Sequence, residues 1–320
     1  MRSGAYKMTD SKIKLGIVGV GKIVRDQHLP SIEKSPTFEL IACASRNASI
    51  DGIASYATIE EMLEAEQNLQ AVALCMPPQH RYKAAHHALA HGLHVLLEKP
   101  PGSTVSEVEQ LEDLANARGV SLYATWHSRH GTAVETAKGL LKDATIQKVN
   151  LDWKEDVRKW HPKQEWIWQA GGLGVFDPGI NGLSILTHVL PSPVFVTAAE
   201  LEFPENRAAP IAANIQFSSA QDIVCNAVFD WRQSGNDAWN ILFETNKGVI
   251  ALRNGGAGLS IDGEDIDLPA PSEHGEYEAI YQGFAEIIKQ QHSDVDLTPL
   301  KLVADAFLLG DRKQVKAFID

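Results

Sequence analysis

Lys99 is the residue whose setting most clearly indicates chemistry. The apolar run His94 to Leu97 and Glu98 precede it, and Pro100 and Pro101 follow it directly. A flexible cation normally lies on a solvated surface, whereas prolines fix the φ angle of the backbone. A lysine held between a buried strand and two prolines is therefore predicted to be catalytic, whether its bond to Pro100 is cis or trans.

A second group of chemically useful residues lies between positions 153 and 181. This stretch contains four of the seven tryptophans, Trp153, Trp160, Trp166 and Trp168. Polar side chains are interleaved with them at Glu155, His161, Asp177 and Asn181. Aromatic faces cover the C–H surface of a sugar while polar groups bind its hydroxyls. The stretch predicts a pocket for a hydroxylated ligand, although each tryptophan alone also fits a core position.

Asp177 and Asn181 are four residues apart at the start of a helix-like run, Gly179 to Val189. Residues at this spacing project from one face of a helix, so both can point toward one substrate. Asp177 also fits a helix N-cap with Pro178 at the first helical position. A capping role and a catalytic role are compatible.

A glycine-rich turn near the N-terminus predicts dinucleotide binding. Gly19, Gly21, Lys22 and Ile23 follow an apolar strand and precede a predicted helix. Glycines allow a tight turn and a close approach of a pyrophosphate to the free N–H groups of the helix. In the usual motif a third glycine allows a close contact between helix and strand, and Val24 stands at that position here. This difference from the motif concerns helix packing and not the phosphate site.

The residues after the next predicted strand suggest which dinucleotide is bound. Ser45 and Arg46 stand where an NAD enzyme usually has an acidic residue for the ribose hydroxyls. A serine hydroxyl and a guanidinium can bind a 2′-phosphate instead. We therefore expect NADP to be preferred and NAD to be an alternative, while the simplest other interpretation of Arg46 is a solvated loop residue.

A double-proline loop and the EKP segment complete the predicted cofactor site. Cys75, Pro77 and Pro78 leave a strand at the sheet edge where such folds bind their ligand, and Glu98 and Lys99 leave another. We expect solvated or structural roles, and no metal site, for the basic residues of the following segment: His80, Arg81, His86, His87 and His91.

Two kinds of periodicity define the elements that must position these residues. Apolar runs of strand length alternate with amphipathic segments as far as about residue 128, which predicts an α/β Rossmann domain with a doubly wound parallel sheet. The predicted strands are Ile13 to Gly19, Phe38 to Ala44, Ala71 to Cys75, His94 to Leu97 and Ser121 to Ala124. A helix is predicted from Thr104, with Glu107 completing a capping box.

Beyond about residue 146 the pattern alternates with period two and predicts an α+β domain with a large antiparallel sheet. Its strands are expected at Gln147 to Lys154, Ile211 to Phe217, Ile223 to Trp231 and Trp239 to Glu244, and its helices at Glu276 to Gln290 and Pro299 to Phe318. We divide the chain into a dinucleotide-binding domain at 1–128, with a flexible arm at 1–12, and a substrate-binding and oligomerisation domain at 129–320.

Composition excludes several classes of protein. The 320 residues are 44% hydrophobic and 22% charged, and the net charge of -12 opposes binding to nucleic acid. No segment has the length and hydropathy of a signal peptide or a membrane span, so we expect a cytoplasmic protein. We interpret the three cysteines as small buried residues of a reducing compartment: Cys43, Cys75 and Cys225.

These features together resemble the Gfo/Idh/MocA family of oxidoreductases. The motifs that carry the resemblance are the glycine turn at 19–24, EKP at 98–100 and GGLGVFDPGIN at 171–181. The resemblance implies a Rossmann domain joined to an open-faced antiparallel sheet domain, with Lys99 and Asp177 facing the nicotinamide and the reacting carbon. Asn181 stands where the family usually has a histidine, so this chain departs from the usual lysine, aspartate and histidine set.

Within the family, the chain resembles the sugar 1-dehydrogenases that act on L-arabinose, D-galactose or D-fucose. The segments involved are ATWHSR at 124–129, KEDVRKWHP at 154–162 and FDPGIN at 176–181. The resemblance implies oxidation of the anomeric carbon of an aldopyranose to a lactone. It implies substrate contacts at His127, Glu155, Trp160, His161, Asp177, Asn181 and Trp239.

Several alternatives stay open at this point. Asp177 is favoured over Lys99 as the base, with Lys99 as orienter, because an ionised carboxylate would hold the lysine charged. Another oxidoreductase of the family, acting on an inositol, a dihydrodiol or a nucleotide sugar, is the first alternative function, and a non-catalytic regulator that binds NAD(P) and a sugar is the second. The open face of the predicted sheet leads us to expect a homodimer.

Overall fold

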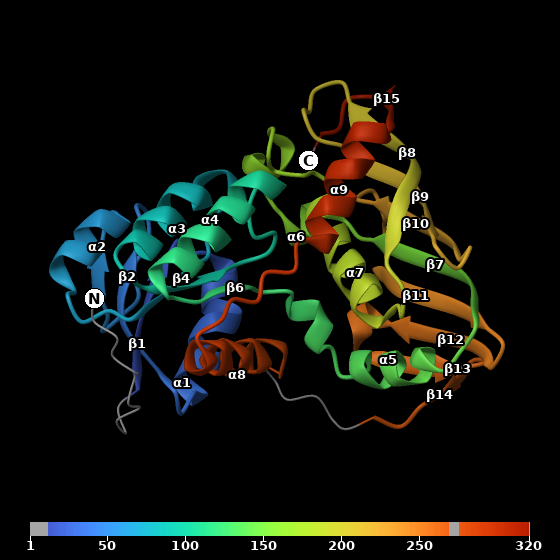
Figure 1. Ribbon diagram of the computed structural model, residues 1–320. Coiled ribbons are helices and arrows are strands. Elements are labelled where there is room, and N and C mark those ends of the chain that lie inside the picture. Colours follow the sequence, from blue (N-terminus) through green and yellow to red (C-terminus); the bar gives the residue numbers. More distant parts are fainter. Residues whose placement is uncertain (1–11, 269–274, 320) are drawn as a thin grey trace. The chain divides into compact units, whose positions relative to one another are not determined.

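The computed structural model describes residues 12–268 and 275–319, which form two compact units (Figure 1). The first unit contains the described residues up to Gly102, together with Ser106–Thr125 and Tyr277–Asp296. The second contains Ser103–Val105, Trp126–Glu276 and the described residues from Leu297 onward. The predicted arm lies outside the described residues except for Lys12. The predicted division at residue 128 also differs from these units, because Tyr277–Asp296 clusters with the first.

The first unit is built on a parallel sheet, whose six described strands have the order β3-β2-β1-β4-β5-β6. The strands are β1 (Ile13–Val18), β2 (Phe38–Ala44), β3 (Ala54–Tyr56), β4 (Ala71–Leu74), β5 (His94–Leu97) and β6 (Leu122–Ala124). The predicted doubly wound parallel sheet is confirmed, and the predicted strands agree within one residue. Strand β3 was not predicted, because it is too short and too exposed to show a hydrophobic pattern.

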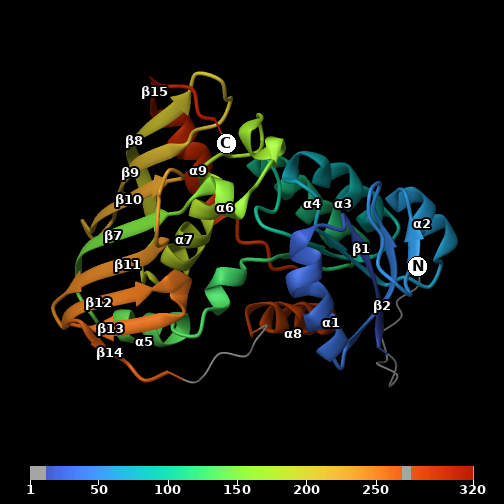
Figure 2. The same cartoon turned by 180° about the vertical axis from the view of Figure 1, so that it is seen from behind.

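Helices enclose this sheet in Figures 1 and 2. They are α1 (Leu29–Lys34), α2 (Ile59–Ala65), α3 (Arg81–Ala90), α4 (Val105–Arg118) and most of α8 (Gly275–Gln290), with a single π turn at Val24–His28 and a 3₁₀ turn at Pro78–His80. Central strand residues such as Leu15, Ala73 and Leu96 are fully buried. Burial on both faces explains why these strands are continuous apolar runs and do not alternate.

Helix α8 belongs to the core of the first unit although it lies far along the chain. Ile280, Tyr281 and Phe284 are buried in the same cluster as residues of β1 and β2. The ring of Phe284 stacks on those of Phe38 and Tyr123, at centroid distances of 5.5 and 6.0 Å. The aromatic face of α8 therefore covers the sheet directly.

The second unit is built on a sheet whose nine described strands have the order β14-β13-β12-β11-β7-β10-β9-β8-β15. The strands are β7 (Ile146–Lys154), β8 (Val194–Pro204), β9 (Ala212–Ser219), β10 (Val224–Asp230), β11 (Ala238–Thr245), β12 (Gly248–Arg253), β13 (Gly258–Ile261), β14 (Glu264–Asp265) and β15 (Asp311–Val315). The sheet is mixed, because β10 runs parallel to β7 and β15 parallel to β8. The long connection from β7 to β8, which contains a helix, allows the first of these parallel pairings.

Helices cover one face of this sheet (Figures 1 and 2). They are α5 (Val134–Lys142), α7 (Phe176–Val189) and α9 (Thr298–Leu309), and a short α6 (Val157–Trp160) follows β7. Along β7, Leu151 and Trp153 are buried while Asp152 and Lys154 are partly exposed. The period-two pattern of the sequence therefore arises because helices cover one face of the sheet and leave the other face open.

The prediction of a single helix from Pro299 to Phe318 was wrong. Helix α9 ends at Leu309, and after Gly310 the chain forms the edge strand β15 beside β8. Any Cβ at Gly310 would lie 2.5 Å from the carbonyl oxygen of Ala306, so a glycine allows the chain to turn there. No helix among the described residues is long and apolar enough to cross a membrane.

Candidate active site

The glycine turn of the first unit has the geometry of a phosphate cradle. Gly19 has a φ of +86°, and a Cβ there would lie 2.7 Å from the backbone nitrogen of Met76. A Cβ at Gly21 would meet nothing within 4 Å, so the turn is open on that side. Gly19 is thus needed by the fold, whereas Gly21 leaves room for a pyrophosphate to approach the backbone.

The residues after the turn have different environments. Lys22 is exposed and pairs with Asp26, and Ile23 packs against the core cluster. Val24 is fully buried in that cluster, in a segment that forms a π turn and not a regular helix. The side chain of Val24 therefore fills space that a glycine would leave to the strand, which accounts for the departure from the usual motif.

Ser45 and Arg46 follow β2 beside this turn. The backbone nitrogen of Gly19 donates to the carbonyl of Ala44 at 2.8 Å, which fixes the end of β2 next to the glycines. Ser45 is half-buried and Arg46 is exposed. In folds of this type the residues after the second strand lie beside the ribose of the dinucleotide. The NADP preference predicted from Ser45 and Arg46 stays a prediction.

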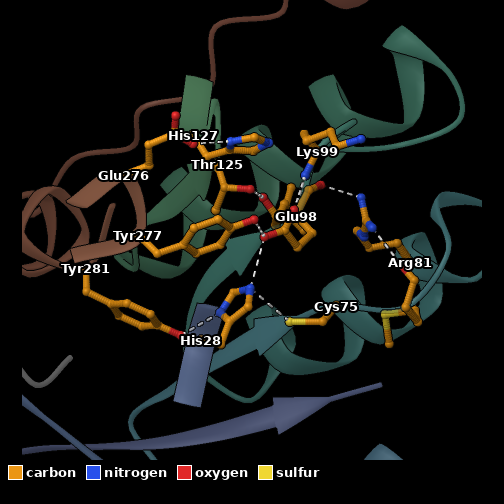
Figure 3. Close-up of polar contacts among 12 residues, drawn as sticks. His28, Cys75, Arg81, Glu98, Lys99, Thr125, His127, Glu276, Tyr277 and Tyr281 are labelled. Atoms are coloured by element: carbon orange, nitrogen blue, oxygen red, sulfur yellow. Dashed lines mark hydrogen bonds and ion pairs between the residues drawn. The ribbon is translucent and has the colours of Figure 1, made fainter. Parts of the chain in front are cut away.

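The ends of β4 and β5 meet a cluster of buried polar residues, drawn in Figure 3. Glu98 is its centre: Oε1 accepts hydrogen bonds from Tyr277 at 2.8 Å and from His28 Nε2 at 2.9 Å. His28 Nδ1 lies 2.8 Å from the hydroxyl of Tyr281, and Cys75 Sγ lies 3.5 Å from Nε2. The predicted cofactor residues Cys75 and Glu98 therefore belong to one hydrogen-bonded group. Cys43 and Cys225 are buried as predicted, but the prediction that Cys75 is buried was wrong, because it lies partly exposed at the end of β4.

The ionisation of His28 follows from these neighbours. Complete burial alone would lower the pKa of His28, but its contacts with Cys75, Tyr281 and the Glu98 carboxylate outweigh burial and raise that pKa well above its ordinary value. In the charged form both ring nitrogens donate, one to the carboxylate and one to the hydroxyl of Tyr281. Burial likewise raises the pKa of Tyr281 to about 12, so its hydroxyl is neutral.

Lys99 is positioned by its backbone. Its N–H donates to Oε2 of Glu98 at 3.0 Å, and its bond to Pro100 is cis. Arg81, the first residue of α3, donates to the carbonyls of both residues that flank Lys99, Glu98 and Pro100. The Lys99 side chain itself is half-buried.

In the loop after β4, Pro78 is buried and Pro77 is partly exposed.

In the second unit, Asp177 is held at the start of α7 and is only 2% exposed. Its Oδ2 lies 3.5 Å from Nε2 of His161, so two predicted site residues come together here. Asp177 lies inside the first turn of α7 and is not its N-cap, because the helix already begins at Phe176. Asn181, one turn further along α7, is partly exposed.

Three tryptophans and a buried glutamate form a second group in this unit. The indole N–H of Trp239 donates to Oε2 of Glu155 at 3.0 Å, and Glu155 is 3% exposed. The ring of Trp239 contacts those of Trp153 and Trp160, at centroid distances of 5.9 and 5.3 Å. Trp160 is 40% exposed, so an aromatic surface meets solvent beside a buried carboxylate.

His127 is placed in a separate contact. Its Nδ1 lies 2.7 Å from Oε2 of Glu276, and the hydroxyl of Ser128 lies 3.4 Å from the same nitrogen. The carboxylate contact fixes the orientation of the imidazole ring. Glu276 therefore orients a predicted substrate-binding residue, and it was not anticipated from the sequence.

The residues that surround Glu98, Lys99 and Asp177 were not predicted from the sequence. His28, Tyr277 and Tyr281 are distant in sequence from Glu98, and Arg81 was grouped with solvated or structural basic residues. Trp231, which is fully buried, packs against His161 and Trp168. The spacing of Tyr277 and Tyr281 on one helix face was the available signal. Among the described residues, no group of histidine, cysteine or carboxylate side chains is arranged to hold a metal ion.

The glycine turn after the first strand of a parallel, doubly wound sheet defines a dinucleotide-binding fold. The model of the Gfo/Idh/MocA family, oxidoreductases with an NAD-binding Rossmann fold, matches residues 13–125. A galactose 1-dehydrogenase from Pseudomonas fluorescens is 44% identical over 312 residues, 96% of this chain and 99% of that protein. This chain therefore belongs to the Gfo/Idh/MocA family of oxidoreductases.

Solved structures agree with this assignment. A D-galactose-1-dehydrogenase from Rhizobium etli is 59% identical, covers 98% of this chain and 100% of that chain, and has a TM-score of 0.92. The 3-ketoreductase KijD10 from Actinomadura kijaniata, in complex with NADP and TDP-benzene, is 18% identical with a TM-score of 0.82, covering 95% of this chain and 100% of that chain. At that identity the second structure supports the fold alone.

Proposed function

We propose that this protein is an NAD(P)-dependent aldose 1-dehydrogenase that oxidises C1 of an aldopyranose to the lactone. The observation that carries the proposal is the similarity to two galactose 1-dehydrogenases over nearly the whole chain. The aromatic and carboxylate group of Trp160, Trp239 and Glu155 supports it, because such a surface suits a neutral hydroxylated ring. L-arabinose and D-fucose are further candidates beside D-galactose.

The residues of this chain supply binding, orientation and proton transfer. When bound, the nicotinamide cofactor accepts the hydride from C1. Asp177 takes the proton of the C1 hydroxyl, and His161, 3.5 Å from its carboxylate, orients it. Lys99 donates to the reacting oxygen and stabilises its negative charge during transfer. Glu155 and Asn181 bind other hydroxyls, and Trp160 and Trp239 cover the ring face.

The cofactor proposal is that NADP is preferred. It is supported by Ser45 and Arg46, which are the first two residues after β2 and neither of which carries a carboxylate. The measurement is kcat/KM for NADP and for NAD, in the wild type and in Arg46→Ala. We expect the wild type to favour NADP and the variant to lose about tenfold of that preference. Arg25→Ala, which removes an arginine bonded to the carbonyl of Ser49, serves as a control. A wild-type ratio that strongly favours NAD contradicts this proposal.

The substrate proposal is tested with a panel of sugars. NADPH absorbance is followed with D-galactose, L-arabinose and D-fucose, and the lactone product is identified by mass spectrometry. An inositol, a trans-dihydrodiol and a nucleotide sugar represent the other substrate classes of the family. Binding of NADP and an aldose without turnover would instead indicate a regulator. No reduction of NADP or NAD with any aldose would overturn the proposal.

We further propose that the enzyme is a homodimer through the open face of the large sheet. Val224, Lys148, Glu244 and Val249 form one register row across β10, β7, β11 and β12. Val224 and Val249 are 55% and 37% exposed, and the ion pair of Lys148 and Glu244, at 3.4 Å, lies between them. Light scattering should give a dimer mass for the wild type and a lower mass for Val224→Glu, whereas a wild-type monomer would refute the assignment.

A further inference from the structure

Arg81 is a buried cation placed between two loops. Its side chain is 2% exposed, although arginine is almost never fully buried without partners. Its Nη2 donates to the carbonyl of Met76 in the loop after β4. Its Nη1 donates to the carbonyls of Glu98 and Pro100 in the loop after β5. One guanidinium therefore connects the two loops and binds the carbonyl groups on both sides of Lys99 (Figure 3).

The same loop is held a second time through the side chain of Glu98. One carboxylate oxygen accepts the N–H of Lys99 at 3.0 Å. The other accepts from Tyr277 at 2.8 Å and from His28 at 2.9 Å. The peptide group between Glu98 and Lys99 is thus fixed at both of its polar atoms, its oxygen by Arg81 and its N–H by the carboxylate.

The chemistry of the contacts explains why an arginine stands here. Burying a guanidinium is unfavourable unless its N–H groups are hydrogen-bonded. The planar fork of arginine presents several N–H groups in fixed directions, so it can bind three carbonyls at once. A lysine carries the same charge on a single nitrogen and does not reproduce this fork. The contacts therefore depend on guanidinium geometry as well as on charge.

We propose that Arg81 and Tyr277 are positioning residues for Lys99. Arg81 holds the carbonyls on both sides of Lys99, and Tyr277 holds the carboxylate that binds its N–H. This proposal rests on the proposed function, because it assumes that Lys99 acts on the substrate. Displacement of a catalytic group by about 1 Å can lower a rate by about 100-fold, so a fixed backbone matters for turnover.

The first test compares three single variants. Arg81→Lys keeps the charge and removes the fork, Tyr277→Phe removes only the hydroxyl, and Lys83→Gln removes an exposed cation from the same helix. We expect kcat to fall between about 10-fold and 100-fold in Arg81→Lys. It should fall about fivefold in Tyr277→Phe and stay unchanged in Lys83→Gln. The KM for the sugar and the Kd for NADP should change less than about threefold in all of them.

The second test needs no substrate. Lys99 is labelled with an amine-reactive ester, and its rate of modification relative to Lys22 is read by peptide mass spectrometry. Lys99 is half-buried, and release of the loop should let it sample solvent more often. Labelling should therefore rise at least about threefold in Arg81→Lys and in Tyr277→Phe, while Lys83→Gln matches the wild type.

The two tests separate this proposal from the proposed function. If the wild type oxidises no aldose, the proposed function fails, and the labelling experiment still decides whether Arg81 and Tyr277 hold Lys99. Unchanged Lys99 labelling in both variants would overturn the positioning role. So would a loss in which kcat, NADP affinity and melting temperature fall together, because that pattern indicates general destabilisation. Tyr277→Phe keeps the test decisive if Arg81→Lys does not fold.

Discussion

The two candidate catalytic residues are held by different physical means. Lys99, in the first unit, lies in a loop whose backbone is fixed by two hydrogen bonds: its own N–H donates to the Glu98 carboxylate, and Arg81 donates to the carbonyl of Glu98. Asp177, in the second unit, lies on a helix that packs directly on a sheet: a Cβ at Gly179 or Gly182 would come within 2.7 Å of an aromatic ring. One residue is positioned by polar contacts and the other by close packing.

This difference shows what each region tolerates. Packing is sensitive to added volume, because the interior is dense and cannot yield. A buried polar cluster is sensitive to the loss of single atoms, because each remaining partner is then left without a hydrogen bond in a place that water does not reach. Variants of the two units should therefore fail in different ways.

The largest expected effect concerns catalysis in the second unit. Asp177→Asn keeps the shape that the packing of α7 requires, but an amide does not accept a proton as a carboxylate does. We expect kcat to fall about 1,000-fold, with the Kd for NADP nearly unchanged. Asp152→Asn, on the open face of the sheet, is the control, and steady-state kinetics with a binding titration give both numbers. Wild-type turnover in Asp177→Asn would remove this residue from the mechanism.

The next effect measures the packing itself. In Gly182→Ala the new methyl group would lie 2.7 Å from the ring of Trp153, and we expect the free energy of unfolding to fall by about 3 kcal/mol. Gly139→Ala is the matched control on α5, where a Cβ meets nothing within 4 Å, and it should stabilise the protein by about 0.5 kcal/mol. Urea unfolding measures both. Equal effects from the two variants would contradict the role of close packing.

A smaller effect compares one polar contact in each unit. Tyr281→Phe leaves Nδ1 of the buried His28 without its partner, which should lower the free energy of unfolding by about 2 kcal/mol. Thr197→Val removes a hydroxyl that donates to the carbonyl of Gln216 at 3.2 Å on the exposed surface of β8, where water can take its place, so the loss should stay below about 1 kcal/mol. If urea unfolding gives the reverse order, the contrast between the units fails.

The smallest effect is a pH dependence of the first unit. Burial lowers the pKa of His94 to about 4, from 6.5 in the unfolded chain, and its Nδ1 accepts the N–H of Ser121 at 3.0 Å. The unfolded chain therefore binds the extra proton, and the stabilisation present above pH 6.5 is lost as the pH falls toward about 4. Between pH 6.5 and 5.5 the loss should be about 1 kcal/mol.

His94→Asn isolates this contribution from other titrating groups. The amide oxygen of asparagine can accept the same N–H but does not titrate. Urea unfolding of both proteins at pH 6.5 and 5.5 gives the difference, and we expect the variant to lose about 1 kcal/mol less than the wild type. An equal loss in the two proteins would show that His94 does not carry the effect.

Much of the first unit was predictable because its signals are local. The strands Phe38–Ala44 and His94–Leu97 were predicted with the bounds that the structure has, since each is an apolar run bounded by polar or turn residues. The glycine turn was recognised for the same reason. The contribution of α8 was not, because the contact between Tyr277 and Glu98 joins residues 179 positions apart and no local pattern reports it.

The second unit also has features that no local sequence pattern predicts. Alternation identified β7, β10 and β11, but it does not tell whether neighbouring strands run parallel or antiparallel, so two parallel pairings were missed. The segment Asp311–Val315 was predicted as helix because its role as an edge strand depends on β8. The sequence placed Asp177 and His161 in one stretch of predicted site residues, but it did not predict that their side chains are in contact.

The return of Tyr277–Asp296 to the first unit has a consequence for the order in which the protein is made. A ribosome finishes the six described strands of the parallel sheet by Ala124, but Phe38 and Tyr123 stay uncovered and His28 lacks Tyr281 until α8 has emerged. The dinucleotide-binding unit therefore completes its fold only after nearly the whole chain has been synthesised. A fragment that ends near residue 128 should expose an apolar surface and aggregate, and gene fusions or truncations need to keep the chain at least to Asp296.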